Sequence, residues 1–277
     1  RARDTVERLA VADLPWEEFA EETLEVLAKA VPFDAATMAP FDPQTGLITG
    51  SVKRAIPSDS YARFAYYEYT APDENSFSRL VKRARPIGVL VDDLGGDPAR
   101  AARYREFYLP ALSLGHEVRV GARSRGALWG GVSLFRETGS HGFTGAEIDL
   151  LDGMIDALVR GFQRGAARGL QMRAERVDPV VLIVDASNTL LAHTTDHVAW
   201  FAQLDPTRIR PLPISVVSAI VRARQRGEAT LTVRAGAYGW ATVRAAVLQG
   251  VSEARSDQVV VTLAQTELSS ALPTSAR

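Results

Sequence analysis

The chain has 277 residues, a length that favours two domains, and its 46% apolar and 23% charged residues are typical of globular proteins. A formal net charge of −1 gives no overall attraction for nucleic acid or an anionic membrane, and the absence of cysteine excludes disulfides, thiolate catalysis and cysteine metal sites. No segment approaches 18 uninterrupted apolar residues and none resembles a signal peptide, so we expect a cytoplasmic protein with no membrane partner.

The first half of the chain predicts a helix, two strands, an irregular helical insert, two more strands and a long helix. Asp13 can cap the first helix, and Gly46 can close the turn of the first hairpin. Thr144 and Glu147 form the pattern of a capping box before the last helix. Helices are expected at 15–31, 60–69, 76–83, 98–109 and from 144 toward 173, and strands at 35–41, 47–53, 116–123 and 127–136.

From residue 178 a second, shorter pattern predicts an antiparallel sheet with two helices. Strands are expected at 180–185, 189–193, 229–235, 240–248 and 259–266, and helices at 195–204 and 214–226. The fold class is therefore α+β, with two tandem modules that are each an antiparallel sheet flanked by helices. We expect domains at residues 1–172 and 178–268, followed by a tail or linker at 269–277.

Several segments of the first module carry a resemblance to a known family. They are Val31 to Asp34, Arg85 to Gly88, Trp129 to Arg136 and Phe143 to Glu147, and together they resemble a GAF domain, in which a glycine-containing strand precedes a capped helix. The segment from Val180 to Leu191 resembles the opening of a PAS domain. A GAF unit followed by a PAS unit is similar to the sensory region of actinobacterial LuxR-type transcriptional regulators.

This resemblance implies a sensor and not an enzyme. It implies a small-molecule-sensing region of a bacterial transcriptional regulator that acts as a homodimer and reaches DNA only through a helix-turn-helix domain outside this chain. The alternative is the sensory segment of a histidine kinase, phosphatase or cyclic-dinucleotide enzyme. The sequence has no P-loop, no G-x-S-x-G and no H-E-x-x-H motif, and no cofactor or catalytic residue is indicated.

The helical insert is rich in tyrosine and phenylalanine. Aromatic side chains offer a large apolar area and tyrosine adds a polar tip, which suits a pocket for a small, mostly apolar ligand. The expected ligand-binding residues are Met38, Phe64, Tyr67, Phe77, Tyr104, Tyr108, His116 and Trp129. The alternative is that the aromatic residues only pack the insert onto the sheet, and that His116 is an ordinary core histidine.

Two further patterns each have more than one interpretation. His193 and His197 are four residues apart, but they lie across the end of a strand and the start of a helix, so two partly exposed side chains are expected and not a metal site. Gly161, Gly165 and Gly169 recur on one helix face, where each glycine costs roughly 1 kcal/mol relative to alanine. Close packing against a dimer partner or against the domain's own helix would compensate, unless this segment is only a linker.

Overall fold

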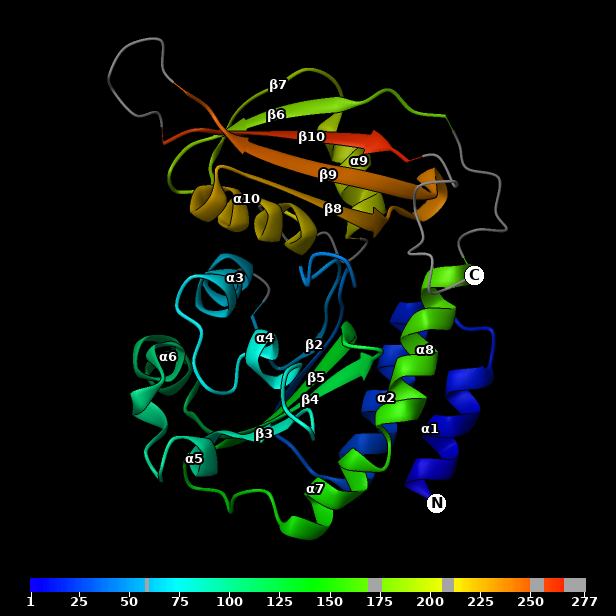
Figure 1. Cartoon of the computed structure of the whole chain (residues 1–277), viewed down its shortest axis with the longest axis vertical. Coiled ribbons are helices and arrows are strands. Elements are labelled where there is room, and N and C mark those ends of the chain that lie inside the picture. The colour runs from blue at the N-terminus through cyan, green and yellow to red at the C-terminus, as the bar shows by residue number, and fades with distance from the viewer. Residues whose placement is uncertain (58–59, 169–175, 206–211, 250–256, 267–277) are drawn as a thin grey trace. The chain divides into compact units, whose positions relative to one another are not determined.

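The computed structural model describes residues 1–57, 60–168, 176–205, 212–249 and 257–266. The chain forms two compact units (Figure 1). Unit 1 comprises Arg1–Phe41, Ser51–Pro57 and Ala71–Arg168, and unit 2 comprises Asp42–Gly50, Ser58–Thr70 and Gly169–Arg277. Two segments from the first half of the chain therefore belong to unit 2.

Unit 1 is built on a five-stranded antiparallel sheet. Its strands are β1 (Ala35–Pro40), β2 (Val52–Arg54), β3 (Ile87–Val89), β4 (Leu114–Ser124) and β5 (Ala127–Glu137), in the order β2-β1-β5-β4-β3. The tight turn between β4 and β5 has positive φ angles at Arg125 (50°) and Gly126 (81°). The long β4–β5 hairpin confirms the two strands predicted at 116–123 and 127–136.

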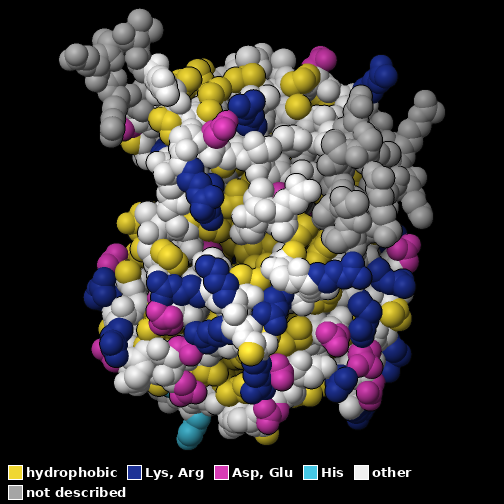
Figure 2. Space-filling view, viewed as in Figure 1, with side chains coloured by type: hydrophobic (Ala, Val, Ile, Leu, Met, Phe, Trp, Pro, Cys, Tyr) yellow, Lys and Arg dark blue, Asp and Glu magenta, His cyan; other side chains and the backbone are white. Residues whose placement is uncertain are grey.

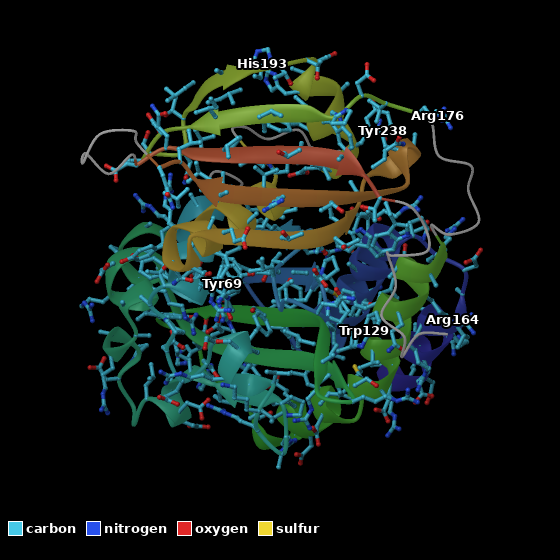
Figure 3. All side chains as sticks on the ribbon, turned by 45° about the horizontal axis from the view of Figure 1, so that its top comes forward. Tyr69, Trp129, Arg164, Arg176, His193 and Tyr238 are labelled. Atoms are coloured by element: carbon cyan, nitrogen blue, oxygen red, sulfur yellow. The ribbon has the colours of Figure 1, made fainter. Side chains whose placement is uncertain are left out.

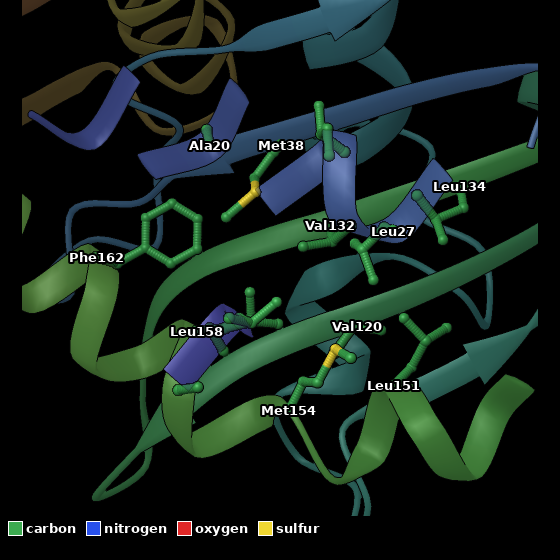
Figure 4. Close-up of a cluster of buried hydrophobic side chains, with 14 of the residues drawn as sticks. Ala20, Leu27, Met38, Val120, Val132, Leu134, Leu151, Met154, Leu158 and Phe162 are labelled. Atoms are coloured by element: carbon green, nitrogen blue, oxygen red, sulfur yellow. The ribbon is translucent and has the colours of Figure 1, made fainter. Parts of the chain in front are cut away.

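Four helices pack on one side of this sheet, which we call the helix side. They are α1 (Ala2–Val11), α2 (Trp16–Ala30), α7 (Gly145–Asp152) and α8 (Ile155–Arg168), and their apolar residues form one buried cluster with β1, β4 and β5 (Figure 4). Phe162 of α8 and Leu27 of α2 lie in this cluster with Met38, Val132 and Leu134 of the sheet.

The glycines of α8 allow it to pack closely on α2. A Cβ atom at Gly161 would lie 2.1 Å from the ring of Phe19, and one at Gly165 would lie 2.7 Å from the Cβ of Trp16. Both distances are too short for a real side chain, so the expectation of close packing against the domain's own helix is confirmed for these two residues. Gly169 lies outside the described residues.

The other side of the sheet carries the insert, and we call it the insert side. The insert contains α4 (Phe77–Leu80), α5 (Leu90–Asp93), η2 (Pro98–Arg100), η3 (Tyr104–Tyr108, a π-helical turn) and α6 (Leu109–Leu112). Its elements α4, α5 and η3 contact β4. The insert therefore lies against β4, next to the edge strand β3.

Unit 2 has a second five-stranded antiparallel sheet. Its strands are β6 (Val180–Val184), β7 (Leu190–His193), β8 (Glu228–Arg234), β9 (Trp240–Val247) and β10 (Val259–Gln265), in the order β7-β6-β10-β9-β8. The helical elements of unit 2 are α3 (Tyr61–Tyr69), α9 (His197–Leu204), α10 (Ile214–Arg226) and the 3₁₀ turn η4 (Gly236–Tyr238). Both sheets place their strands in the order second, first, fifth, fourth, third, and the predicted α+β class with two antiparallel sheets is confirmed.

Several local predictions are corrected by the structure. Pro15 is the N-cap of α2 and no side chain caps this helix, so the role given to Asp13 is wrong. Instead, Oδ2 of Asp13 lies 3.8 Å from Nε of Arg168. The strand predicted at 47–53 is reduced to Val52–Arg54, because Asp42–Gly50 belongs to unit 2. The single helix expected from 144 is two helices, whereas the capping box at its start is present.

Candidate functional site

A row of buried polar residues crosses the insert side of the sheet in unit 1. Successive residues of a strand point to opposite faces, and Val132 and Leu134 belong to the helix-side cluster, so Gly131, Ser133 and Phe135 face the insert. A Cβ atom at Gly131 would indeed meet the ring of Phe77, a residue of the insert.

The strand register extends this row across three strands. Ser133 pairs with Arg119 of β4 and with Thr37 of β1, and all three residues are buried. Glu117 lies two residues before Arg119 on the same face of β4. The insert side of the sheet thus presents charged and hydroxyl groups, whereas the buried cluster on the helix side is hydrophobic.

Four charged side chains form a buried chain of ion pairs between the insert and β4. Nε of Arg103 lies 2.5 Å from Oδ2 of Asp73, and Nη2 of Arg103 lies 2.6 Å from Oε2 of Glu117. Nε of Arg119 lies 2.8 Å from Oε1 of Glu117, and its Nη1 donates to the backbone oxygen of Asn75. Charged side chains of both signs are interspersed on the visible surface (Figure 2), but none of these four side chains is more than 9% exposed.

The two carboxylates and the two guanidinium groups balance one another in charge. Burial opposes ionisation of Asp73, but the guanidinium of Arg103 holds the pKa of this carboxyl below its usual range. Burial likewise opposes the charge of Arg103, whose pKa is nevertheless raised by Glu117 and Asp73. Taking an ion out of water costs several kcal/mol, so removal of one member would leave an uncompensated buried charge.

Aromatic residues of the insert surround this ion-pair chain. The guanidinium carbon of Arg103 lies 4.8 Å from the ring centre of Tyr104, and that of Arg119 lies 4.8 Å from the ring centre of Phe77. Tyr108 lies 5.0 Å from Tyr104, measured between ring centres. Both guanidinium groups are therefore held against aromatic rings as well as between carboxylates.

Some buried polar atoms at this place have no hydrogen-bond partner among the described residues. They include the hydroxyl of Tyr104, the hydroxyl of Ser133 and Nη1 of Arg103, which are inaccessible to solvent. Burial raises the pKa of Tyr104 far above its ordinary value, so its hydroxyl is a neutral donor and acceptor. An unpaired buried polar group costs about 1–3 kcal/mol, and such groups in native proteins call for a specific explanation.

The structure brings together three of the eight predicted ligand residues. The three are Phe77, Tyr104 and Tyr108, which lie on the insert side and adjoin the buried ion pairs. The ring centre of Tyr108 also lies 5.1 Å from that of Phe135. Ligand binding at these residues stays a prediction.

The other five residues lie elsewhere. Met38 and Trp129 belong to the helix-side cluster, so they do not lie with Phe77, Tyr104 and Tyr108, and ligand binding at these two residues stays a prediction (Figures 3 and 4). His116 precedes Glu117 and so points to the opposite face, and its Nδ1 is 3.5 Å from the position of a Cβ at Gly142.

Phe64 and Tyr67 lie on α3, which belongs to unit 2. The sequence places them in the same insert as Phe77, but the chain passes into unit 2 between Ser58 and Thr70.

The sequence analysis did not identify the charged and hydroxyl residues of this site. They are Asp73, Arg103, Glu117, Arg119 and Ser133. The signal that points to them is the alternation of Glu117 and Arg119 with valines in one strand. Because other elements pack on both faces of this strand, the face that carries Glu117 and Arg119 must bury their charges.

The histidine pair of unit 2 joins the end of β7 to the start of α9. The ring centres of His193 (labelled in Figure 3) and His197 lie 4.3 Å apart with their planes tilted by 49°, and Nδ1 of His193 lies 3.0 Å from the backbone oxygen of Thr195. Within the described ranges, no three histidine or carboxylate side chains are placed to hold a metal ion. In the same part of the chain, no helix is long and apolar enough to cross a membrane.

The sequence matches no protein-family model and no curated protein. Solved structures similar to this chain include the GAF domain of a phosphoenolpyruvate-protein phosphotransferase from Coxiella burnetii. The two sequences are 14% identical and the TM-score is 0.44, and the match covers 61% of this chain and 95% of that one. The corresponding GAF domain from Acinetobacter has 14% identity and a TM-score of 0.42, with coverage of 60% and 93%. A GAF domain/HD domain protein from Geobacter sulfurreducens has 18% identity and a TM-score of 0.38, with coverage of 53% and 93%.

Proposed function

We propose that unit 1 is a small-molecule-sensing regulatory domain whose ligand binds at the insert side of its sheet. The observation that carries this proposal is the set of buried, unpaired polar atoms on Tyr104, Ser133 and Arg103. A protein keeps such groups at a cost of about 1–3 kcal/mol each, and a bound molecule that hydrogen-bonds to them removes that cost. The resemblance of the sequence to GAF domains is in keeping with this role.

The charges at the site favour an uncharged ligand. Arg103 and Arg119 are already matched by Asp73 and Glu117, so an added ion would bring an unbalanced charge into a buried place. Nη1 of Arg103 can only donate, and the two hydroxyls can also donate. The ligand that fits is a small neutral molecule with a carbonyl oxygen as acceptor, and with an apolar part that packs against Phe77 and Tyr108.

A binding screen tests this proposal directly. Small neutral amides, ketones and lactones would be compared with carboxylates of the same size by thermal shift and calorimetry on the whole chain. Neutral compounds should raise the melting temperature, and Ser133→Ala should weaken their binding. Ser140 is exposed, so Ser140→Ala should leave their binding unchanged. Binding that is indifferent to Ser133→Ala would place the site elsewhere, and preference for carboxylates would refute the ligand class.

We propose further that unit 2 is a PAS-like module and that the parent protein is a homodimeric transcriptional regulator with a separate DNA-binding domain. The sequence resemblance from Val180 to Leu191 and the strand order β7-β6-β10-β9-β8 support the PAS-like assignment. Ligand-dependent binding of the full-length parent to its promoter DNA would support the output. Ligand-dependent phosphotransfer or cyclic-dinucleotide turnover would instead assign the chain to a signalling enzyme.

A further inference from the structure

The row of buried polar residues in unit 1 continues past β4 to the edge strand β3. Gly88 of β3 pairs with Arg119 of β4, so a side chain at this position would lie on the insert side with that of Arg119. Asn75 of the insert, which is buried, fills this space. A Cβ atom at Gly88 would lie 2.7 Å from Cγ of Asn75 and closer still to its amide group. The row of Thr37, Ser133 and Arg119 therefore ends in Asn75.

The side chain of Asn75 is fixed to helix α5. Its amide nitrogen faces the carboxylate of Asp93, because the opposite orientation would set two acceptor oxygens against each other. In this orientation Nδ2 donates to Oδ2 of Asp93 at 2.8 Å and Oδ1 accepts from the backbone N–H of Leu90 at 3.1 Å. Leu90 begins α5, whose N-cap residue makes no side-chain hydrogen bond, so Asn75 caps this turn instead. Asp93 is held in turn by Nη1 of Arg83 at 2.9 Å.

The backbone of Asn75 bonds to both ends of the chain of ion pairs. Its N–H donates to Oδ1 of Asp73 at 2.7 Å, and its carbonyl oxygen accepts from Nη1 of Arg119 at 3.2 Å. Asp73 pairs with Arg103, which pairs with Glu117, which pairs with Arg119. Asn75 thus closes the four charged side chains into a ring.

We propose that Asn75 is the positioning residue of this site, because its side chain, held between Gly88 and α5, fixes the backbone groups that hold Asp73 and Arg119. The proposal rests on the proposed function only in that the ring borders the ligand site. A binding group whose position is set beforehand costs less conformational entropy when the ligand arrives. A ligand that bonds to Nη1 of Arg103 would therefore meet a guanidinium that is already in place.

The substitution Gly88→Ala tests this role without changing Asn75 or any charged residue. The φ angle of Gly88 is not positive, so alanine can adopt its backbone conformation, but the added methyl group must displace the Asn75 side chain. The hydrogen bond from Asn75 to Asp73 should then weaken. We expect the pKa of Asp73, measured on the unliganded whole chain by carbon-13 NMR of its carboxyl group, to rise by about one. This rise corresponds to the loss of roughly one hydrogen bond to a charged group.

Gly130→Ala is the matched control. Gly130 lies on β5 of the same sheet, and a Cβ atom there would collide with the ring of Phe162 on the helix side. This variant should lower the free energy of unfolding and leave the pKa of Asp73 unchanged. Asn75→Ala should raise the pKa of Asp73 as Gly88→Ala does. In the Asn75→Ala background, Gly88→Ala should add no further rise, because the amide group that it displaces is absent.

Each result supports or overturns the proposal. An unchanged pKa of Asp73 in Gly88→Ala or in Asn75→Ala overturns it, and so does an equal rise in Gly130→Ala. A further rise in the double variant overturns it as well, since Gly88→Ala would then act on Asp73 by another route. The test uses no ligand, so a compound screen without hits would refute the proposed function and leave the role of Asn75 standing.

Discussion

Replacement of Tyr104 by phenylalanine should strengthen the fold and weaken ligand binding at the same time. The hydroxyl of Tyr104 is buried without a partner among the described residues, while its ring packs 5.0 Å from that of Tyr108 and 4.8 Å from the guanidinium carbon of Arg103. Tyr104→Phe removes the unpaired group and keeps the ring. Since leaving such a group unpaired costs about 1–3 kcal/mol, we expect the free energy of unfolding to rise by about 1 kcal/mol.

The corresponding rise in melting temperature is about 2–4 °C for a protein of this size, which differential scanning calorimetry resolves. A neutral ligand that accepts or donates a hydrogen bond at this hydroxyl should bind roughly 5–10-fold more weakly, equivalent to about 1–1.4 kcal/mol. Tyr66→Phe is the matched control, because Tyr66 is 48% exposed and should affect neither quantity.

The two measurements together distinguish the possible roles of Tyr104. A loss of stability in Tyr104→Phe would mean that its hydroxyl has a structural partner, and it would remove the main support for the ligand site. Unchanged ligand affinity with increased stability would mean that the ligand binds elsewhere. Only the combination of a more stable protein and weaker binding supports the proposed site.

Three further predictions concern stability. Gly165→Leu should lower the free energy of unfolding by about 1–3 kcal/mol in urea titrations, because the α2 backbone occupies the space of a side chain, whereas the exposed Ala167→Leu should have little effect. Thr144→Ala should cost about 0.5–2 kcal/mol through loss of the capping box, and Ser140→Ala should cost nothing measurable. The pKa of Asp73 is lowered in the folded state, so its ionised carboxylate stabilises the fold above about pH 4. This stabilisation is lost as the pH falls through the pKa of Asp73 in the folded state. Asp73→Asn should therefore flatten the acid limb of the stability–pH curve, and an unchanged limb would contradict the assignment.

Much of the fold follows from local patterns. The predicted helix at 214–226 has the bounds of α10, and the strands of unit 2 were each predicted to within a residue or two, because alternation and turn residues are local signals. The capping box of Thr144 and Glu147 is equally local, with Oε2 of Glu147 accepting from the Thr144 backbone N–H at 2.7 Å. Such features depend on residues a few positions apart.

The features that were missed depend on distant contacts. Helix α1 was not predicted because only Val6 and Ala10 of its ten residues are buried. Their burial results from the packing of α1 against α8 and α2. Strand β3 is three residues long and is defined by its pairing with β4. The association of α3 with α10 requires two surfaces that no local pattern relates.

The candidate site was predicted in part for the same reason. Phe77, Tyr104 and Tyr108, which were chosen because the insert is rich in aromatic residues, adjoin the buried ion pairs. The sequence alone does not tell on which face of the sheet the Met38 side chain lies, because it does not tell which face the helices cover. The pairing of Arg103 with Glu117 was likewise out of reach, because it joins an irregular turn to a strand whose relative position is set by the whole insert.

The strand order shared by the two sheets has a consequence for how the chain folds during its synthesis. In each sheet the first strand pairs with the fifth, so neither sheet can close until its last strand has left the ribosome. Unit 2 must wait longest, because Asp42 bonds to Thr232 across 190 residues and its central strand β10 is the last strand in the described part of the chain. Long-range pairing of this kind slows folding and prolongs the exposure of apolar surface. We therefore expect α3 to emerge early and to remain without its partner while unit 1 assembles, so that the nascent chain depends on chaperones until α10 is made.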